Sequence, residues 1–204
     1  MDWETFTIGF WHPFGDHGAH PDGRIETADE ILQRKSLEIA STGGWTLWSF
    51  QYRRDLDELV KVLEQVNSGR VYALCSDSRS TVAPSGEVRR CRQYRPARTN
   101  EWQDIPNTIS IPHPFGKREY ACAFKIRQII ELSGQDQCPA IDIEWYSTRT
   151  KQWSTIFRTR NDPQRKGYPP RPEMLIRLSH DGVPLRPVRA VLELAPPFLA
   201  TLRV

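Results

Sequence analysis

The chain has 204 residues, a length that suits one domain with a substantial hydrophobic core. Hydrophobic residues make up 38% of the chain, which is polar for a globular protein but excludes intrinsic disorder, and no run approaches the roughly 20 apolar residues of a membrane-spanning helix. The net charge is only +3, and this modest figure conceals strong local clusters of charge.

The N-terminus and the cysteines indicate a cytoplasmic protein. The first four residues are acidic and lack the basic and apolar regions of a secretory signal. The cysteines, Cys75, Cys91, Cys122 and Cys138, show no Cys-x-x-Cys spacing, so free thiols are expected rather than a zinc site. The sequence predicts no bound metal and no cofactor.

The first quarter of the chain predicts a strand, a helix and a second strand. Residues 5–11 alternate apolar and polar side chains, and a polar turn at residues 12–20 follows. A helix is predicted at 27–42, opened by a capping box in which Thr27 and Glu30 satisfy each other's backbone N–H groups.

The predicted strand at 45–52 carries large apolar groups on both faces. Alternation sends Trp45 and Leu47 to one face and Trp48 and Phe50 to the other. Such a strand is covered on both sides, unless one face is open to a ligand.

A second amphipathic helix is predicted at 55–67. Strands are predicted after it at 70–76, 108–111, 120–132, 140–146, 152–158, 174–178 and 187–194. The Arg-, Ser- and Pro-rich stretch 77–107 predicts a loop with at most one short hairpin at 84–86, and the four prolines of 161–172 predict a loop or linker. These elements favour a single α+β domain over residues 1–204, with a mostly antiparallel sheet that is curved or closed into a barrel and an elaborated basic C-terminal part.

Arginines cluster in two segments that also contain Tyr94, Trp102, Trp153 and Tyr168. Basic side chains interleaved with aromatic rings are typical of surfaces that contact phosphates and stack on bases. The predicted phosphate contacts are Arg89, Arg90, Arg92, Arg95, Arg158 and Arg160. The competing interpretation is that these arginines are ordinary solvated surface.

The turn at 12–20 and the strand at 45–52 together predict a ligand pocket. Loops on a rigid scaffold commonly carry function, and the histidines could bond to the edge of a base while an indole supplies the stacking face. The predicted ligand-binding residues are Trp11, His12, Asp16, His17, His20, Trp45, Trp48 and Phe50. The competing interpretation is that the aromatic residues are core and the histidines are surface groups.

A rival function is a metal-dependent hydrolase or nuclease. It would use the histidine turn or the carboxylates Asp142 and Glu144, which alternate onto one face of a predicted strand. The Glu-x-Lys spacing of many such nucleases is absent, because Trp145 and Tyr146 follow Glu144.

The order of these features resembles the PUA-like superfamily, which includes the EVE, YTH and ASCH domains. The resemblance covers about residues 5–132 and is carried by the segments 6–11, 44–50, 69–74 and 123–130. The Gly-x-Lys-Thr signature of ASCH domains is missing, and the stretch 77–107 departs from the family layout. The resemblance implies a small barrel with early helices that binds RNA, or DNA carrying modified bases, in an aromatic pocket.

Overall fold

The computed structural model describes residues 8–14, 26–50, 55–66, 70–77, 88–112, 120–132, 142–154, 174–178, 183–184 and 188–203. The helices are α1 (Ala28–Ser41) and α2 (Leu56–Val66). The strands are β1 (Ile8–Phe14), β2 (Thr46–Phe50), β3 (Tyr72–Asp77), β4 (Val88–Pro96), β5 (Gln103–Pro112), β6 (Tyr120–Glu131), β7 (Asp142–Ser147), β8 (Gln152–Ser154), β9 (Met174–Leu178), β10 (Val183–Pro184) and β11 (Val188–Arg203).

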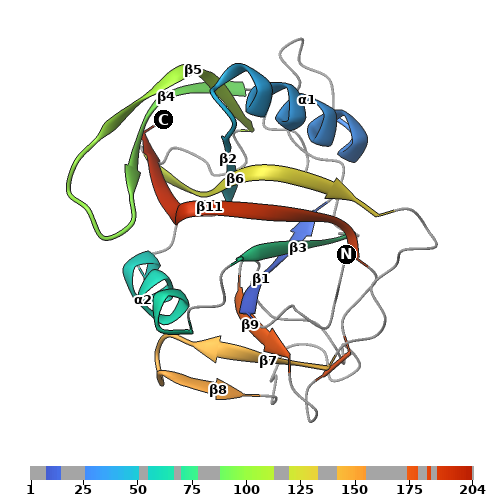
Figure 1. Cartoon of the computed structure of the whole chain (residues 1–204), viewed down its shortest axis with the longest axis vertical. Coiled ribbons are helices and arrows are strands. Elements are labelled where there is room, and N and C mark those ends of the chain that lie inside the picture. The colour runs from blue at the N-terminus through green and yellow to red at the C-terminus, as the bar shows by residue number, and fades with distance from the viewer. Residues whose placement is uncertain are drawn as a thin grey trace.

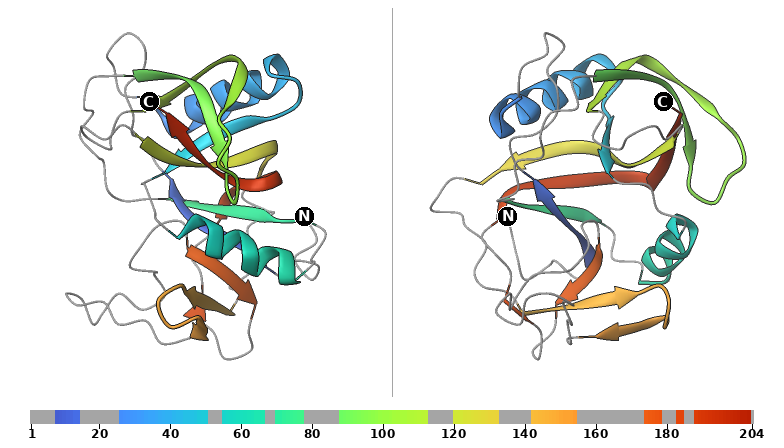
Figure 2. Two further views of the ribbon diagram at one scale, coloured as in Figure 1. Left: turned by 90° about the vertical axis from the view of Figure 1, so that its left-hand side faces the viewer. Right: turned by 180° about the vertical axis from the view of Figure 1, so that it is seen from behind.

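All the described strands belong to one sheet that is organised around β11 (Figures 1 and 2). The long strand pairs with β6 along one edge, and with β3 and then β4 along the other. The β1–β3 pair is parallel and every other described pair is antiparallel. The prediction of an α+β fold with a mostly antiparallel sheet is therefore confirmed, while the sheet formed by these strands is not closed into a barrel.

Strands β5, β4, β11, β6 and β2 form a curled part of the sheet, at the upper side of Figure 1. The side chain of Leu47 on β2 packs inside the curl with Tyr94, Ile109 and Leu202. Trp48, the next residue along β2, points the other way into a larger core that α1 and α2 cover. The prediction that both faces of this strand are covered is confirmed, because every residue of β2 is buried.

Helix α1 lies at the open seam of the curl, where β2 and β5 approach each other. Lys35 of α1 is buried and its Nζ donates to the backbone oxygen of Leu47 on β2, at 2.7 Å. The side-chain amide of Asn107 on β5 donates to the backbone oxygen of Ser41 at the end of α1. A helix thus covers the strand edges that a closed barrel would pair with each other.

Lys35 belongs to a buried ionic network on α1. Its Nζ also donates to Oε2 of Glu38 at 2.6 Å, and the hydroxyl of Thr46 donates to the same oxygen at 2.8 Å. Arg34 bridges Glu26 and Glu38, with its Nε 2.7 Å from Oε1 of Glu26. Each buried charge therefore has an opposite charge beside it, which offsets the cost of removing it from water.

Both predicted helices are confirmed, and α1 has the capping box of Thr27 and Glu30. The prediction of a loop through 77–107 is wrong, because β4 and the start of β5 form a hairpin whose turn lies at 97–102. Polar residues fill most positions of β4, so the inward residues Cys91 and Tyr94 did not produce a visible alternation. A register shift between Cys91 and Gln93 further changes their spacing from two residues to three.

The predicted strand at 187–194 continues in the structure to Arg203. Pro196 and Pro197, within this extension, lack the N–H group that a strand ladder uses. The ladder with β6 is interrupted there, between Leu194 and Leu199, and then resumes. The predicted hairpin at 84–86, the linker at 161–172 and most of the turn at 12–20 lie outside the described residues.

Two further expectations concern the helices and the thiols. Neither helix that the structure describes combines the length and apolar character needed to cross a membrane. Cys75, Cys91 and Cys122 are buried thiols outside any disulfide, in agreement with the expected reduced cysteines, and burial raises the pKa of Cys75 far above its usual range.

Stability should increase with pH through the titration of Lys35. Burial lowers the pKa of Lys35 from 10.5 to about 8, although the neighbouring Glu38 acts in the opposite direction. Between these pH values the unfolded chain keeps a proton that the folded chain has released, so the free energy of unfolding rises with pH. We expect urea denaturation to show a rise of up to about 3 kcal/mol that Lys35→Met lacks.

The control for this experiment is Lys61→Met, because Lys61 is exposed on α2. The control should keep the pH profile of the parent protein. Parallel pH profiles for the parent and Lys35→Met would show that Lys35 stays charged throughout this range.

Candidate functional site

Four of the predicted pocket residues lie in the core. Trp11, His12, Trp48 and Phe50 are 4%, 6%, 5% and 2% exposed. The indole Nε1 of Trp48 donates to Nε2 of His12 at 3.1 Å, and the imidazole lies edge-on to the Phe124 ring, 5.6 Å away. Because Nε2 accepts this bond, the ring proton of His12 lies on Nδ1. His12 and Phe50 both pack on the Phe124 ring, and the burial of all four side chains leaves no open ring face on which a base could stack.

Trp45 lies on the opposite side of β2 and is half-buried. The Nζ of Lys125 lies 4.4 Å from the centre of the Trp45 ring and 5.5 Å from that of Tyr94. Burial lowers the pKa of Lys125 and raises that of Tyr94. The cation is thus already enclosed by two rings of the protein itself. The other predicted residues of the pocket, Asp16, His17 and His20, lie outside the described residues.

The carboxylate of Glu144, predicted as a metal ligand, is engaged by an arginine. Nε of Arg177 donates to its Oε2 at 2.6 Å, and the guanidinium lies over the Trp153 ring at 4.5 Å. A neighbouring cation neutralises the charge that would attract a metal ion. Among the described residues, no three His, Cys, Asp or Glu side chains are grouped so that they could hold a metal.

The predicted arginines of the first basic segment lie on β4. Arg92 is exposed and Arg95 is half-buried, while Arg89 and Arg90 precede them on the same strand. The predicted contacts Arg158 and Arg160 fall outside the described residues. The pairing of β4 with β5 and β11 therefore determines which side chains lie beside Arg92 and Arg95.

Strand register places one row of polar and aromatic residues across four strands. Gln93 of β4 pairs with Asp104 of β5 on one side and with Arg203 of β11 on the other, and Arg203 pairs in turn with Tyr120 of β6. Their inward neighbours Tyr94 and Leu202 fill the curl, so the row faces away from it. Arg95 follows Gln93 by two residues and lies on the same face.

Trp102, at the end of the turn before β5, lies across this face. The guanidinium groups of Arg95 and Arg203 lie over its ring at 5.8 and 5.7 Å, and the Tyr120 ring stacks with it at 5.9 Å and 25°. Of the described large hydrophobic side chains, only Leu37 and Tyr120 are classed as exposed. We call Arg95, Trp102, Tyr120 and Arg203 the Trp102 surface.

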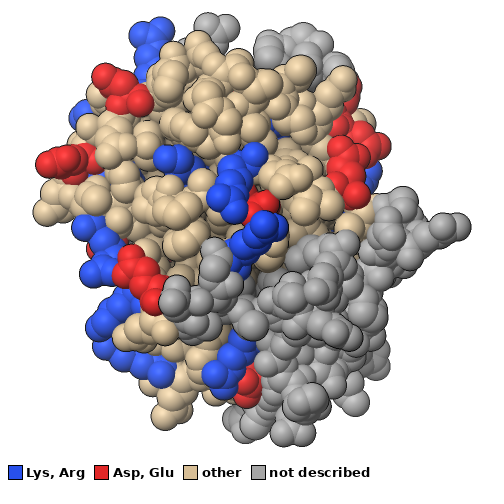
Figure 3. Space-filling view, viewed as in Figure 1, with Lys and Arg blue, Asp and Glu red and all other residues tan. Residues whose placement is uncertain are grey.

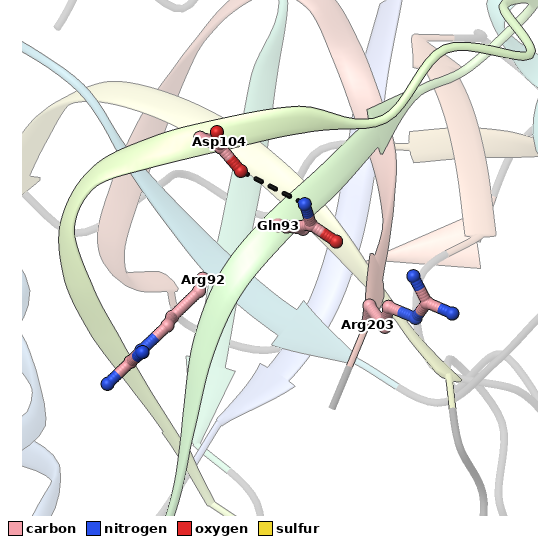
Figure 4. A pocket seen from close by; sticks show the side chains of 4 residues that line it. All are labelled: Arg92, Gln93, Asp104 and Arg203. Atoms are coloured by element: carbon pink, nitrogen blue, oxygen red, sulfur yellow. Dashed lines mark hydrogen bonds between the residues drawn. The ribbon is translucent and has the colours of Figure 1, made fainter.

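A pocket of about 330 Å³ adjoins the Trp102 surface and shares Arg203 with it. It is lined by Arg92, Gln93, Asp104 and Arg203. Figure 4 shows Gln93 and Asp104 in the middle, with Arg92 on one side and Arg203 on the other. The side-chain amide of Gln93 donates to Oδ1 of Asp104 at 3.0 Å. The pocket therefore offers both hydrogen-bond donors and acceptors beside an aromatic stack.

Charge elsewhere on the visible face is mixed. Figure 3 shows Lys and Arg side chains interspersed with Asp and Glu rather than gathered in one field. Arg98, which lies in the same basic segment as Arg95, forms an ion pair with Glu64 of α2. Its backbone N–H also donates to Asp57 at 2.7 Å, so the turn after β4 is fixed to the helix.

Sequence reasoning recognised Trp102 as an aromatic residue among arginines but missed Gln93, Asp104, Tyr120 and Arg203 as its neighbours. They come from four strands, and Arg203 lies beyond the prolines that concealed the end of β11. The sequence signal that could have found them is the pair Cys91 and Tyr94. Both are buried inside the curl, so the residues on the other face of β4 are the ones that face outward.

Searches of protein-family models, of curated proteins and of solved structures found no match to this chain.

Replacing Trp48 by Phe tests its role in the core. The variant keeps an aromatic ring but removes the indole N–H that His12 accepts. We expect the free energy of unfolding to fall by about 1–3 kcal/mol, as for other buried hydrogen bonds that lose one partner. Urea denaturation measures the loss, and unchanged stability would contradict a structural role for the bond.

Proposed function

We propose that this protein is a nucleic-acid-binding module whose contact surface is the Trp102 surface. The observation that carries the proposal is the grouping of two guanidinium groups over the Trp102 ring, beside the exposed Tyr120 ring. Arginine beside stacked aromatic rings suits single-stranded nucleic acid, because every base has a face that can stack and every nucleotide brings a phosphate.

In this proposal the arginines and the rings have different tasks. Arg92 and Arg203 are exposed, and Arg95 is half-buried, so their guanidinium groups can reach phosphates around the pocket. Such contacts position the strand without reading its sequence. The ring of Tyr120 supplies the stacking face, and Trp102 beneath it keeps that ring in place.

The architecture supports a PUA-like module. Two early helices, a curled antiparallel sheet and an aromatic residue beside a pocket agree with what the resemblance implies. A base that is unpaired, or flipped out of a duplex, could place its face on Tyr120 and its edge in the neighbouring pocket. The stacking groups in this proposal differ from Trp11 and Trp48, which are core residues.

Binding should depend strongly on salt. Fluorescence anisotropy with labelled single- and double-stranded DNA and RNA would measure it, with modified bases as a further arm. We expect single strands to bind best at low salt, with a logarithmic slope against salt of about −2 for three phosphate contacts. If no probe binds at low salt, the proposal is wrong.

Trp102→Ala should weaken single-strand binding about tenfold or more, because Tyr120 loses the ring that holds it in place and one stacked base contributes about 1–3 kcal/mol. The matched control is Trp153→Ala, because Trp153 also lies under an arginine but belongs to β8, away from β4 and β5 in Figure 1. The control should bind as the parent does. Equal losses in both variants would place the contact elsewhere.

A further inference from the structure

The pocket beside Trp102 has a composition that a phosphate site would not have. Asp104 lines the pocket beside Gln93, so a phosphate seated against this pair would meet a carboxylate (Figure 4). Like charges in contact oppose binding. The pocket therefore suits a neutral polar group, with phosphates at the two arginines that flank it.

The orientation of Gln93 adds an acceptor to this pocket. Its amide nitrogen is directed at Oδ1 of Asp104, at 3.0 Å, so its carbonyl oxygen points away from that carboxylate. The second carboxylate oxygen of Asp104 is a further acceptor, and the guanidinium of Arg203 supplies donors. A ligand that fits must present donors on one edge and acceptors on another.

Among the common bases, guanine has this arrangement most completely. Its N1–H and N2 amino group form adjacent donors that match a carboxylate, and its O6 and N7 form adjacent acceptors that match arginine. In adenine and cytosine the amino group lies beside a ring nitrogen that accepts rather than beside a second donor, and thymine and uracil carry no amino group.

We propose that the pocket of Arg92, Gln93, Asp104 and Arg203 recognises an unpaired guanine. Asp104 accepts from the N1 and N2 donors, Arg203 donates to the O6 and N7 edge, and Tyr120 stacks on the ring. This inference rests on the proposed nucleic-acid binding and adds the identity of the base.

The test uses single-stranded oligonucleotides of thymidine, and of uridine for RNA, that carry one central guanine, adenine or cytosine. Fluorescence anisotropy measures each dissociation constant. We expect the guanine probe to bind about tenfold more tightly than the others, the lower range for a bidentate base contact. Equal binding of all probes would overturn the guanine inference and leave the proposed function intact, whereas no binding of any probe would overturn both.

Asp104→Asn separates base recognition from charge. Asn keeps an oxygen that can accept from Gln93, but it offers one acceptor where the N1–H and N2 donors need two. The variant should lose the guanine preference, while its affinity for plain oligothymidine stays equal or rises because a negative charge is gone. A parallel change for all probes, or a retained preference, would overturn the role of Asp104.

The control is Glu101→Gln, because Glu101 is an exposed acid in the turn just before β5 and does not line the pocket. It removes the same charge and should keep the guanine preference of the parent. Loss of the preference in this control as well would assign the effect to local charge and overturn direct recognition by Asp104.

Discussion

The hydrogen bonding of β11 along both of its edges is the constraint on which the described structure depends. One edge pairs with β6 over nearly its whole length, and the other pairs first with β3 and then with β4. Its first half contributes Leu192 and Leu194 to the larger core, and its last residues contribute Ala200 and Leu202 to the inside of the curl. A slip of one residue would exchange the two faces of the strand. The same register fixes Arg203 between Gln93 and Tyr120, so the candidate site is a direct result of it.

The buried charges of α1 show how the sheet is stabilised at its unpaired seam. Lys35 is buried and Arg34 half-buried, and their pKa values move in opposite directions. Burial disfavours the charge on each of them. Arg34 is held by Glu26 and Glu38, which together outweigh burial and raise its pKa. Lys35 forms an ion pair with Glu38, but burial and the nearby charge of Arg34 lower its pKa. Lys35 nevertheless joins α1 to β2 beside the bond from Thr46 to Glu38, so part of this link depends on the group that loses its proton more easily.

Elements with a clear period were predictable, and elements made mostly of polar residues were not. The capping box and the apolar stripe identified α1 and α2, and the apolar face of β2 predicted its burial. Strand β4 was missed because only Cys91 and Tyr94 of its described side chains face the curl, at a spacing altered by a bulge. The site could be predicted only as a type, arginine with aromatic residues. Its members come from strands β4, β5, β6 and β11, and their pairing depends on register rather than on sequence distance.

The ion pairs of the other described arginines explain why, in the proposed function, affinity for nucleic acid would come from one small surface. Arg34, Arg98, Arg127, Arg177 and Arg189 all form ion pairs with acidic side chains. The net charge is only +3, so no strong field of the whole protein attracts a polyanion. Exposed charges act over about 8 Å at physiological salt. In the proposed function, attraction to phosphate arises from the described side chains of Arg92, Arg95 and Arg203, which lie close together through strand pairing and Trp102. With so few contacts to the backbone of a nucleic acid, stacking and the pocket of Asp104 would supply a large part of the binding energy, and discrimination between bases would follow from the same groups.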